Sequence, residues 1–325
     1  MQRVPIDGAA NIFEILERAA AQFGDRDFLV MGQREEAIGF AALAQRAEHM
    51  AHRLAALGVV PGDRVALWMT NKVDWAVAAY AIARAGAVMV GVSTRLTPRE
   101  VTHMIALTQA KLWIIEDVFL GKVQAAAELM PAVLHELAGR GLSAPGRLVW
   151  SWTRTRYPGA EDWHEQAGLP AGPSLPCAAT LTAASGAQFA ELQGVAAILS
   201  TSGTTGAPKG VMLTHAGLIK LSDEVGKRQY LDPAQRFYSI APFFHCSGYM
   251  HGLLTNLIAG STYFSTRQFN AAESWAVLSG EGVTAYHGFI GALQELPSQP
   301  GFDPQRLVLD RAERVNDFET SGVGI

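Results

Sequence analysis

Residues 195–213 read VAAILSTSGTTGAPKGVML and set a polar loop between two short apolar runs. The runs 195–199 and 211–213 have the length and composition of buried strands. Between them, glycines let the backbone turn its N–H groups toward an anion, hydroxyl side chains add neutral donors, and Lys209 adds a positive charge. The stretch therefore predicts a strand–loop–strand unit that holds a polyphosphate.

Two other interpretations of this loop fit its residues less well. A P-loop has Gly directly before its lysine and Ser or Thr directly after it, whereas Lys209 stands between Pro208 and Gly210. A solvent-exposed Ser/Thr/Gly linker would predict neither the apolar runs on both sides nor the rigid Pro-Lys-Gly ending. We therefore expect a phosphate-binding loop of a different type, exposed between its two strands.

On both sides of this loop, helical spacing of apolar residues alternates with short apolar runs. Ile12, Ile15 and Ala19, for example, recur three and four positions apart, which is typical of an amphipathic helix. Such alternation is typical of βαβ units, so we expect an α/β fold in three layers, with mostly parallel sheets flanked by helices in layered lobes. The expected helices are 11–23, 40–57, 74–85, 98–108 and 218–225, and the expected strands are 64–68, 88–92, 111–115, 195–199, 211–213, 237–240 and 283–286.

The residue composition and periodicity change twice along the chain and indicate its domain organisation. Scattered Trp, Pro, Gly and Thr without periodicity make residues 151–190 an irregular connection between two lobes. Residues 1–150 then form a first α/β lobe, and residues 191–308 form a second α/β lobe that carries the phosphate-binding loop. Residues 309–325 are a divergent tail.

Composition argues against several classes of protein. The chain has 325 residues, of which 49% are hydrophobic, 26 basic and 30 acidic, and it has no basic run to neutralise phosphates, so nucleic acid is not an expected partner. The N-terminus lacks the pattern of a secretory signal, and two cysteines make no disulfide framework, so we expect a cytoplasmic protein. Residues 75–92 are interpreted as a buried helix and strand, and no integral membrane span is expected.

Residues 201–210, TSGTTGAPKG, resemble the phosphate-binding signature of the adenylate-forming (AMP-binding) superfamily, which includes the acyl-CoA synthetases. Further segments are similar to successive segments of acyl-CoA synthetases in the same order: 62–66, Asn71, 94–100, 241–248 and 283–288. The resemblance covers most of the chain, apart from residues 151–190 and the end after about residue 307. The chain thus resembles the N-terminal portion of an acid–thiol ligase.

The resemblance implies a ligase that works in two steps and uses ATP, Mg²⁺ and coenzyme A. In the first step a carboxylate attacks the α-phosphate of ATP and gives an acyl-adenylate and pyrophosphate. In the second step a thiol displaces AMP. No metal-ligating side chain is assigned, and the residues that would hold the ATP phosphates with Mg²⁺ are Thr201, Ser202, Gly203, Thr204, Thr205, Gly206 and Lys209.

The aromatic-His segment after residue 240 would border the acid. By the resemblance, His245 is the candidate catalytic residue beside the carboxylate and the adenylate. The expected substrate pocket consists of Phe244, His245, Ser247 and Gly248. The expected partner is a small-molecule carboxylic acid. The apolar residues Phe243, Phe244, Tyr249 and Met250 favour a fatty or aryl acid, and we expect a role in fatty acid metabolism.

Several segments of full-length family members have no counterpart in this chain. They are the Gly-Tyr-Gly-x-Thr-Glu segment that holds adenine and magnesium, the Asp that binds the ribose, and the C-terminal catalytic domain with its lysine. We therefore expect a truncated synthetase that is inactive alone and whose exposed surface favours self-association. The alternative is a non-catalytic nucleotide-binding remnant or pseudo-enzyme.

Two weaker patterns around His245 are interpreted as structural. His245 and His251 have no Cys-x-x-Cys pair or second ligand cluster near them in sequence, so no zinc site is expected. Cys246 adjoins His245, but neighbours on an extended strand point to opposite faces, so the two are not expected to form a catalytic dyad. Packing is the expected role of Cys246.

Overall fold

The computed structural model of the protein describes residues 2–119, 121–123, 125–126, 128–129, 147–150, 194–201, 209–288 and 290–309. Within these residues the chain forms two mainly parallel sheets. Sheet A has the strand order β11-β9-β10-β1-β2, and sheet B has the order β6-β5-β3-β4-β7-β8. The α/β fold expected from the sequence is confirmed.

Sheet B carries the expected strand–loop–strand unit at one edge. Its described strands are parallel neighbours except for the last pair, β7 and β8, which is antiparallel. They are β3 (Arg64–Trp68), β4 (Val88–Gly91), β5 (Leu112–Ile115), β6 (Arg147–Trp150), β7 (Val195–Thr201) and β8 (Lys209–Thr214).

Sheet A combines strands from distant parts of the chain. They are β1 (Asp27–Met31), β2 (Glu36–Gly39), β9 (Arg236–Ser239), β10 (Thr262–Ser265) and β11 (Ala285–His287). Its described pairs are parallel except β1 with β2. Both sheets thus contain strands from residues 1–150 and from residues 191–308. That each of these two ranges folds as a lobe of its own stays a prediction.

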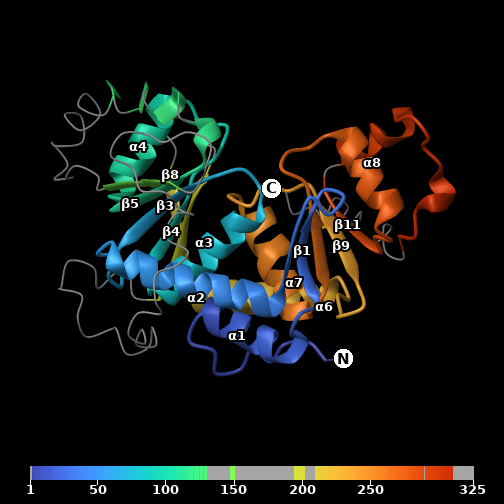
Figure 1. The fold of residues 1–325 in the computed structure, drawn as a ribbon, viewed down its shortest axis with the longest axis horizontal. Helices are drawn as coiled ribbons and strands as arrows, with labels where there is room; N and C mark the ends of the chain where they lie inside the picture. The colour runs from blue at the N-terminus through green and yellow to red at the C-terminus, as the bar shows by residue number, and fades with distance from the viewer. Residues whose placement is uncertain are drawn as a thin grey trace.

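One layer of helices lies between the two sheets and belongs to both. Leu67 of β3 and Leu29 of β1 face the same apolar core, together with Ala79 of α3 (Val73–Arg84). Figure 1 shows α3 and α7 between the sheets. The helices that contribute to this shared core are α1 (Ile12–Phe23), α2 (Phe40–Ala56), α3, α6 (His215–Arg228) and α7 (Thr255–Ala259).

The outer faces of the sheets have their own helices. Val101 of α4 (Pro98–Thr108) packs with Ala66 and Trp68 on the far face of sheet B, and α8 (Ala271–Gly280) packs on the far face of sheet A (Figure 1). The layers therefore run helix, sheet, helix, sheet, helix. The expectation of three layers is wrong, because two sheets bury their inner faces against the same helices.

The local signals in the sequence place most elements correctly. Asn11 begins α1, and its side chain accepts hydrogen bonds from the backbone N–H groups of Phe13 and Glu14. The expected buried helix is α3, whose residues from Val73 to Ala83 are all buried. None of the helices in the described ranges combines the length and the apolar character needed to cross a bilayer.

Several short elements were not predicted. They include β1, β2, β10, α7, α8 and α9 (Ile290–Gln294), a π-helix at Ser247–Leu254, and 3-10 turns at Asp117–Phe119, Leu296–Ser298 and Pro304–Arg306. Their runs of apolar residues are too short to show a period. The new strands are stabilised by pairing, β1 with β2 nearby in the chain and with β10 far away in it, and α8 is stabilised by packing in the core on the far face of sheet A.

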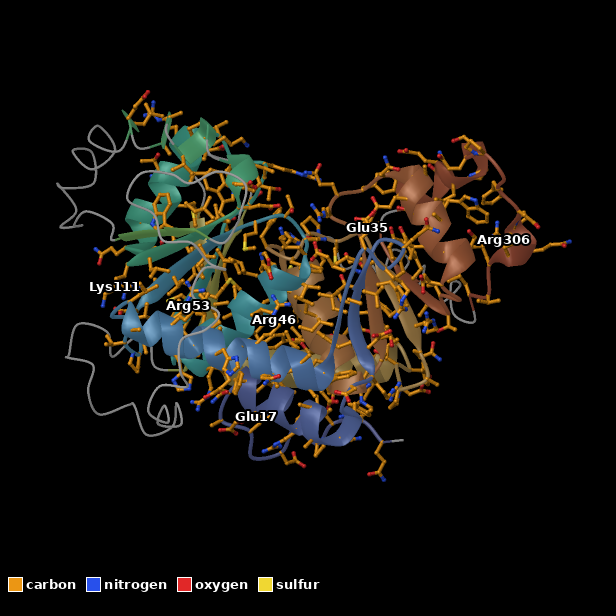
Figure 2. The ribbon with its side chains drawn as sticks, viewed as in Figure 1. Glu17, Glu35, Arg46, Arg53, Lys111 and Arg306 are labelled. Atoms are coloured by element: carbon orange, nitrogen blue, oxygen red, sulfur yellow. The ribbon has the colours of Figure 1, made fainter. Side chains whose placement is uncertain are left out.

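Ion pairs tie the helices and the strand ends at the surface. Arg46 of α2 reaches Asp74 in the first turn of α3, with 2.6 Å between the guanidinium and the carboxylate (Figure 2). Lys111, directly before β5, lies 2.7 Å from Asp63, directly before β3, and marks the amino-terminal edge of sheet B (Figure 2). The candidate site lies at the opposite, carboxyl edge.

The packing of the shared layer can be tested at Gly260, the left-handed residue that ends α7. Gly58 and Gly260 both have positive φ, 84° and 73°, but a Cβ on Gly58 meets nothing within 4 Å, whereas one on Gly260 would lie 2.1 Å from Cζ of Phe23. Gly58→Ala should cost about 1–2 kcal/mol from backbone strain. Gly260→Ala should cost about 1–3 kcal/mol more, because the core is overpacked.

Urea unfolding of the two variants gives this difference directly. Equal losses of stability at the two positions would contradict the packing of Phe23 against the end of α7.

Candidate functional site

The carboxyl ends of β3, β4, β5 and β7 meet at one edge of sheet B, because these strands are parallel neighbours. Polar residues follow them: Thr70 and Lys72 after β3, Arg95 after β4 and Glu116 after β5. The helices α3 and α4, which follow β3 and β4, cover opposite faces of the sheet. Open α/β sheets bind ligands at such a point.

The expected phosphate-binding loop leaves sheet B at this edge. Thr201, the last residue of β7, pairs with Lys209, the first residue of β8, and Lys209 is exposed. The two strands are present as predicted, but each extends two residues into the stretch expected as loop, so Thr201 and Lys209 are strand residues. Residues 202–208 lie outside the described residues, so the phosphate-binding roles of Ser202, Gly203, Thr204, Thr205 and Gly206 stay predictions, as do those of Thr201 and Lys209.

His245 comes from sheet A but lies against sheet B. After β9 ends at Ser239, the chain crosses to β4. The carbonyl oxygen of Phe244 passes so close to Gly91 that a Cβ on Gly91 would lie 3.0 Å from it and 2.8 Å from Cδ2 of Leu199. The glycine in β4 therefore lets the His245 segment approach the strand that leads into the expected phosphate-binding loop.

The His245 ring has a defined hydrogen-bond arrangement. Its Nδ1 lies 2.8 Å from Oγ of Ser247 and accepts the backbone N–H of the same residue at 3.3 Å. Since a backbone N–H can only donate, Nδ1 is the acceptor and the neutral ring carries its proton on Nε2. Partial burial, and then the positive charge of Arg95, lower the pKa of His245. The ring is thus a neutral donor through Nε2 at pH 7.

The four expected pocket residues lie in one short segment: Phe244 and His245 in a tight turn, and Ser247 and Gly248 at the start of the π-helix that follows it. The backbone N–H of His245 donates to the carbonyl of Pro242 at 3.0 Å, and a Cβ on Gly248 would lie 2.1 Å from that oxygen. Gly248 is therefore required by the turn itself. Phe244 and Ser247 are half-buried beside His245. That this group binds the acid stays a prediction.

Three of the four apolar residues that favoured a fatty or aryl acid belong to the protein core: Phe243, Tyr249 and Met250. Phe243 and Tyr249 are fully buried, and each packs edge-on against Trp75 of α3 with 5.6 Å between ring centroids. Their apolar character therefore serves the shared helical layer. Phe244 is half-buried and remains available to the site.

The expected geometry of Cys246 is wrong. Residues 243–246 form a turn that leads into the π-helix Ser247–Leu254 and not an extended strand, so neighbouring side chains do not alternate between faces. Cys246 is exposed, and its Sγ lies 3.6 Å from Nδ1 of His245. Partial burial raises the pKa of its thiol. A protonated thiol is a poor nucleophile, so the contact does not indicate thiol catalysis.

Two further histidines lie behind the turn and were not assigned from the sequence. His251 of the π-helix stacks on His287 at the end of β11, with 5.6 Å between ring centroids. Burial, and then the neighbouring His251, lower the pKa of His287 to about 4. Within the described ranges, no group of three or more His, Cys, Asp or Glu side chains is placed to hold a metal ion.

The two sheets, with the polar residues at their carboxyl edges, define an α/β protein whose candidate site lies where these edges meet. The family model for AMP-binding enzymes matches residues 16–316, and the chain belongs to this family. The predicted resemblance to adenylate-forming enzymes is confirmed. The expected class of enzyme, an AMP-forming acid–thiol ligase, is confirmed at the level of the family.

Relatives of this chain are CoA ligases. The 3-[(3aS,4S,7aS)-7a-methyl-1,5-dioxo-octahydro-1H-inden-4-yl]propanoyl:CoA ligase of Mycobacterium tuberculosis is 30% identical over 301 residues, covering 90% of this chain and 54% of the relative. The acyl-CoA ligase sidI of Aspergillus fumigatus is 29% identical over 306 residues, covering 90% and 49%. The chain spans about half the length of the curated relatives it matches.

Solved structures show the same fold. The benzoate CoA ligase from Burkholderia xenovorans LB400 matches with a TM-score of 0.72 and 23% identity, covering 92% of this chain and 54% of that chain. At this identity the likeness concerns the arrangement of the layers and not the ligand.

The electrostatic contact between His245 and Arg95 predicts a measurable change of pKa. Arg95→Ala should raise the pKa of His245, because it removes a positive charge that opposes protonation, while partial burial still keeps the pKa below its ordinary value. NMR titration of the histidine ring signals measures this, with His245 assigned by the signal lost in His245→Gln. Arg99→Ala removes an exposed cation four positions further along and serves as the control. An unchanged titration in Arg95→Ala would show that the two groups do not interact.

Proposed function

We propose that this chain takes part in the ATP-dependent activation of a small carboxylic acid to an acyl-adenylate and then to an acyl-CoA thioester. In the first step an oxygen of the acid attacks the α-phosphorus, and the bond to pyrophosphate breaks. In the second step the sulfur of coenzyme A attacks the acyl carbon, and AMP leaves.

One observation carries the proposal. The family match over residues 16–316 includes the loop TSGTTGAPKG, and the structure joins both ends of this loop to strands at the carboxyl edge of sheet B. At that edge the exposed Lys209 offers a positive charge. An exposed ammonium at the mouth of a glycine- and hydroxyl-rich loop fits a polyphosphate.

Three described polar residues of the site have a role in this proposal. Lys209 would bind the β- and γ-phosphates, and Arg95 would add positive charge to the same edge. The Nε2–H of a neutral His245 would donate a hydrogen bond to an oxygen of the acid or of the adenylate, where negative charge is held. Mg²⁺ usually binds through substrate phosphates with one or two carboxylates, so it would enter with ATP.

The acid is proposed to be fatty or aryl. The support is the partly exposed ring of Phe244 beside His245 and the name of one relative, the acyl-CoA ligase sidI of Aspergillus fumigatus. Phe243, Tyr249 and Met250 belong to the core, so Phe244 is the apolar residue of this segment that supports the proposed class of acid. Coenzyme A is proposed on the family alone.

The role of Lys209 can be tested by calorimetry with ATP and Mg²⁺. Lys209→Ala should weaken binding by roughly 1.5–3 kcal/mol, the scale of a hydrogen bond to a charged group. Lys220→Ala removes an exposed lysine of α6 and should leave the affinity unchanged. Equal affinities of wild type and Lys209→Ala would remove Lys209 from the site, and absence of any ATP binding by the wild-type chain would contradict the proposed function.

The first half-reaction is measured separately by exchange of labelled pyrophosphate into ATP. Fatty and aromatic acids should each be tested with the wild-type chain, with Lys209→Ala as the reference. If the wild-type chain exchanges pyrophosphate faster than Lys209→Ala, and only when an acid is present, this would show that the chain adenylates that acid. Amino acids as the preferred substrates would contradict the proposed class of acid.

A further inference from the structure

The loop after β3 is anchored at the carboxyl edge of sheet B by one buried carboxylate. Oε2 of Glu116 accepts hydrogen bonds from the backbone N–H and the hydroxyl of Thr70, both at 2.7 Å. Its Oε1 lies 3.5 Å from Nζ of Lys72. The relative exposure of Glu116 is 3% and that of Lys72 is 0%. The residues on both sides of Asn71 are therefore fixed to the end of β5.

Asn71 itself bonds to the chain that leads to His245. Its Nδ2 donates to the carbonyl of Ala241 at 3.0 Å, and its Oδ1 accepts the backbone N–H of Phe243 at 2.8 Å. Nδ2 also lies 3.3 Å from Oγ of Ser265 in β10. The Asn71 side chain belongs to the edge of sheet B, whereas all three of its partners belong to sheet A or to the segment after β9.

The hydrogen bonds of Asn71 end next to the His245 turn. Between its two backbone partners stands Pro242, whose carbonyl accepts the N–H of His245 at 3.0 Å. The carbonyl of His245 in turn accepts the N–H groups of Gly248 and Tyr249, at 3.0 and 2.9 Å. A displacement of residues 241–243 would therefore move the His245 ring directly.

Physical considerations favour a positional role for this arrangement. A buried ion pair such as Lys72 with Glu116 contributes little net stability, because desolvation offsets the attraction. Buried and fully bonded polar groups do, however, fix one geometry, since any other leaves a donor or an acceptor unpaired. Turns that carry functional side chains need such support, because surface loops are otherwise mobile.

We propose that Asn71 is a positioning residue of the candidate site, which sets the place of His245 by bonding residues 241–243 to the carboxyl edge of sheet B. The inference rests on the proposed function only where it takes His245 to donate a hydrogen bond to the acid or the adenylate. The hydrogen bonds between Asn71 and residues 241–243 form without any bound nucleotide.

Cys246 provides a probe of the turn. Cys177→Ser leaves Cys246 as the single thiol of the chain, and Cys246 is exposed beside His245. In this background, Asn71→Ala should speed alkylation of Cys246 by iodoacetamide about fivefold or more, because a released turn loses the partial burial that raises the pKa of the thiol. The pKa of His245, measured by NMR, should rise toward its ordinary value as the turn leaves its partly buried position near Arg95.

Asn11→Ala is the matched control. Asn11 and Asn71 are equally buried, each with 4% exposure, and Asn11 also bonds to two backbone groups, but it caps α1. Both variants should lose stability, yet only Asn71→Ala should change the Cys246 rate and the His245 titration. A wild-type rate in folded Asn71→Ala, or an equal acceleration in Asn11→Ala, overturns the proposal.

A second variant decides the question if Asn71→Ala does not fold. Asn71→Ser keeps a polar group that is too short to reach both Ala241 and Phe243, and it should show the same acceleration, whereas a wild-type rate overturns the proposal. Because the labelling needs no nucleotide, a chain that binds no ATP but shows this response would refute only the proposed function. A chain that binds ATP without the response would refute only the role of Asn71.

Discussion

The burial of two sheet faces against one layer of helices is the constraint on which the rest of the structure depends. Leu67 of β3 and Leu29 of β1 reach the same core from opposite sides, and α3 between them has hardly any exposed residue. Apolar burial of this kind is the main driving force of folding. Each sheet excludes water from its inner face only together with the helices that the other sheet also covers, so the two sheets have fixed relative positions. Their carboxyl edges come within hydrogen-bond distance at Asn71 and Ala241.

The candidate site follows from this meeting of edges. Sheet B contributes the ends of β4 and β7 with the loop between Thr201 and Lys209, and sheet A contributes the turn that holds His245. Small residues make the approach feasible: Gly91 admits the carbonyl of Phe244, and Gly248 admits that of Pro242. A positively charged edge beside a neutral imidazole suits a reaction in which negative charge passes between a carboxylate and phosphates.

The turn is also shaped by the π-helix that follows it. In Ser247–Leu254 the backbone is wider than in an α-helix, a form that is rare and often found at functional sites. It places His251 on His287, where burial keeps both rings neutral by lowering their pKa values. The protein therefore holds uncharged imidazole rings behind the site, while Arg95 and Lys209 bring positive charge at the edge of sheet B.

The sequence by itself determined the local elements and the chemical nature of the loop. Asn11 and Gly24 delimit α1 at the expected places, because capping depends on near neighbours. The hydroxyl- and glycine-rich stretch joins two strands as its pattern predicts, with Lys209 as the first residue of the second strand. Only the tertiary structure decided that the sheets share one helical layer, that Phe243 and Tyr249 lie in the core and that Asn71 holds the His245 turn. Asn71 and Ala241 are 170 positions apart in the chain, and a contact over that distance leaves no period or spacing in the sequence, since it arises only when both sheets pack on the same helices.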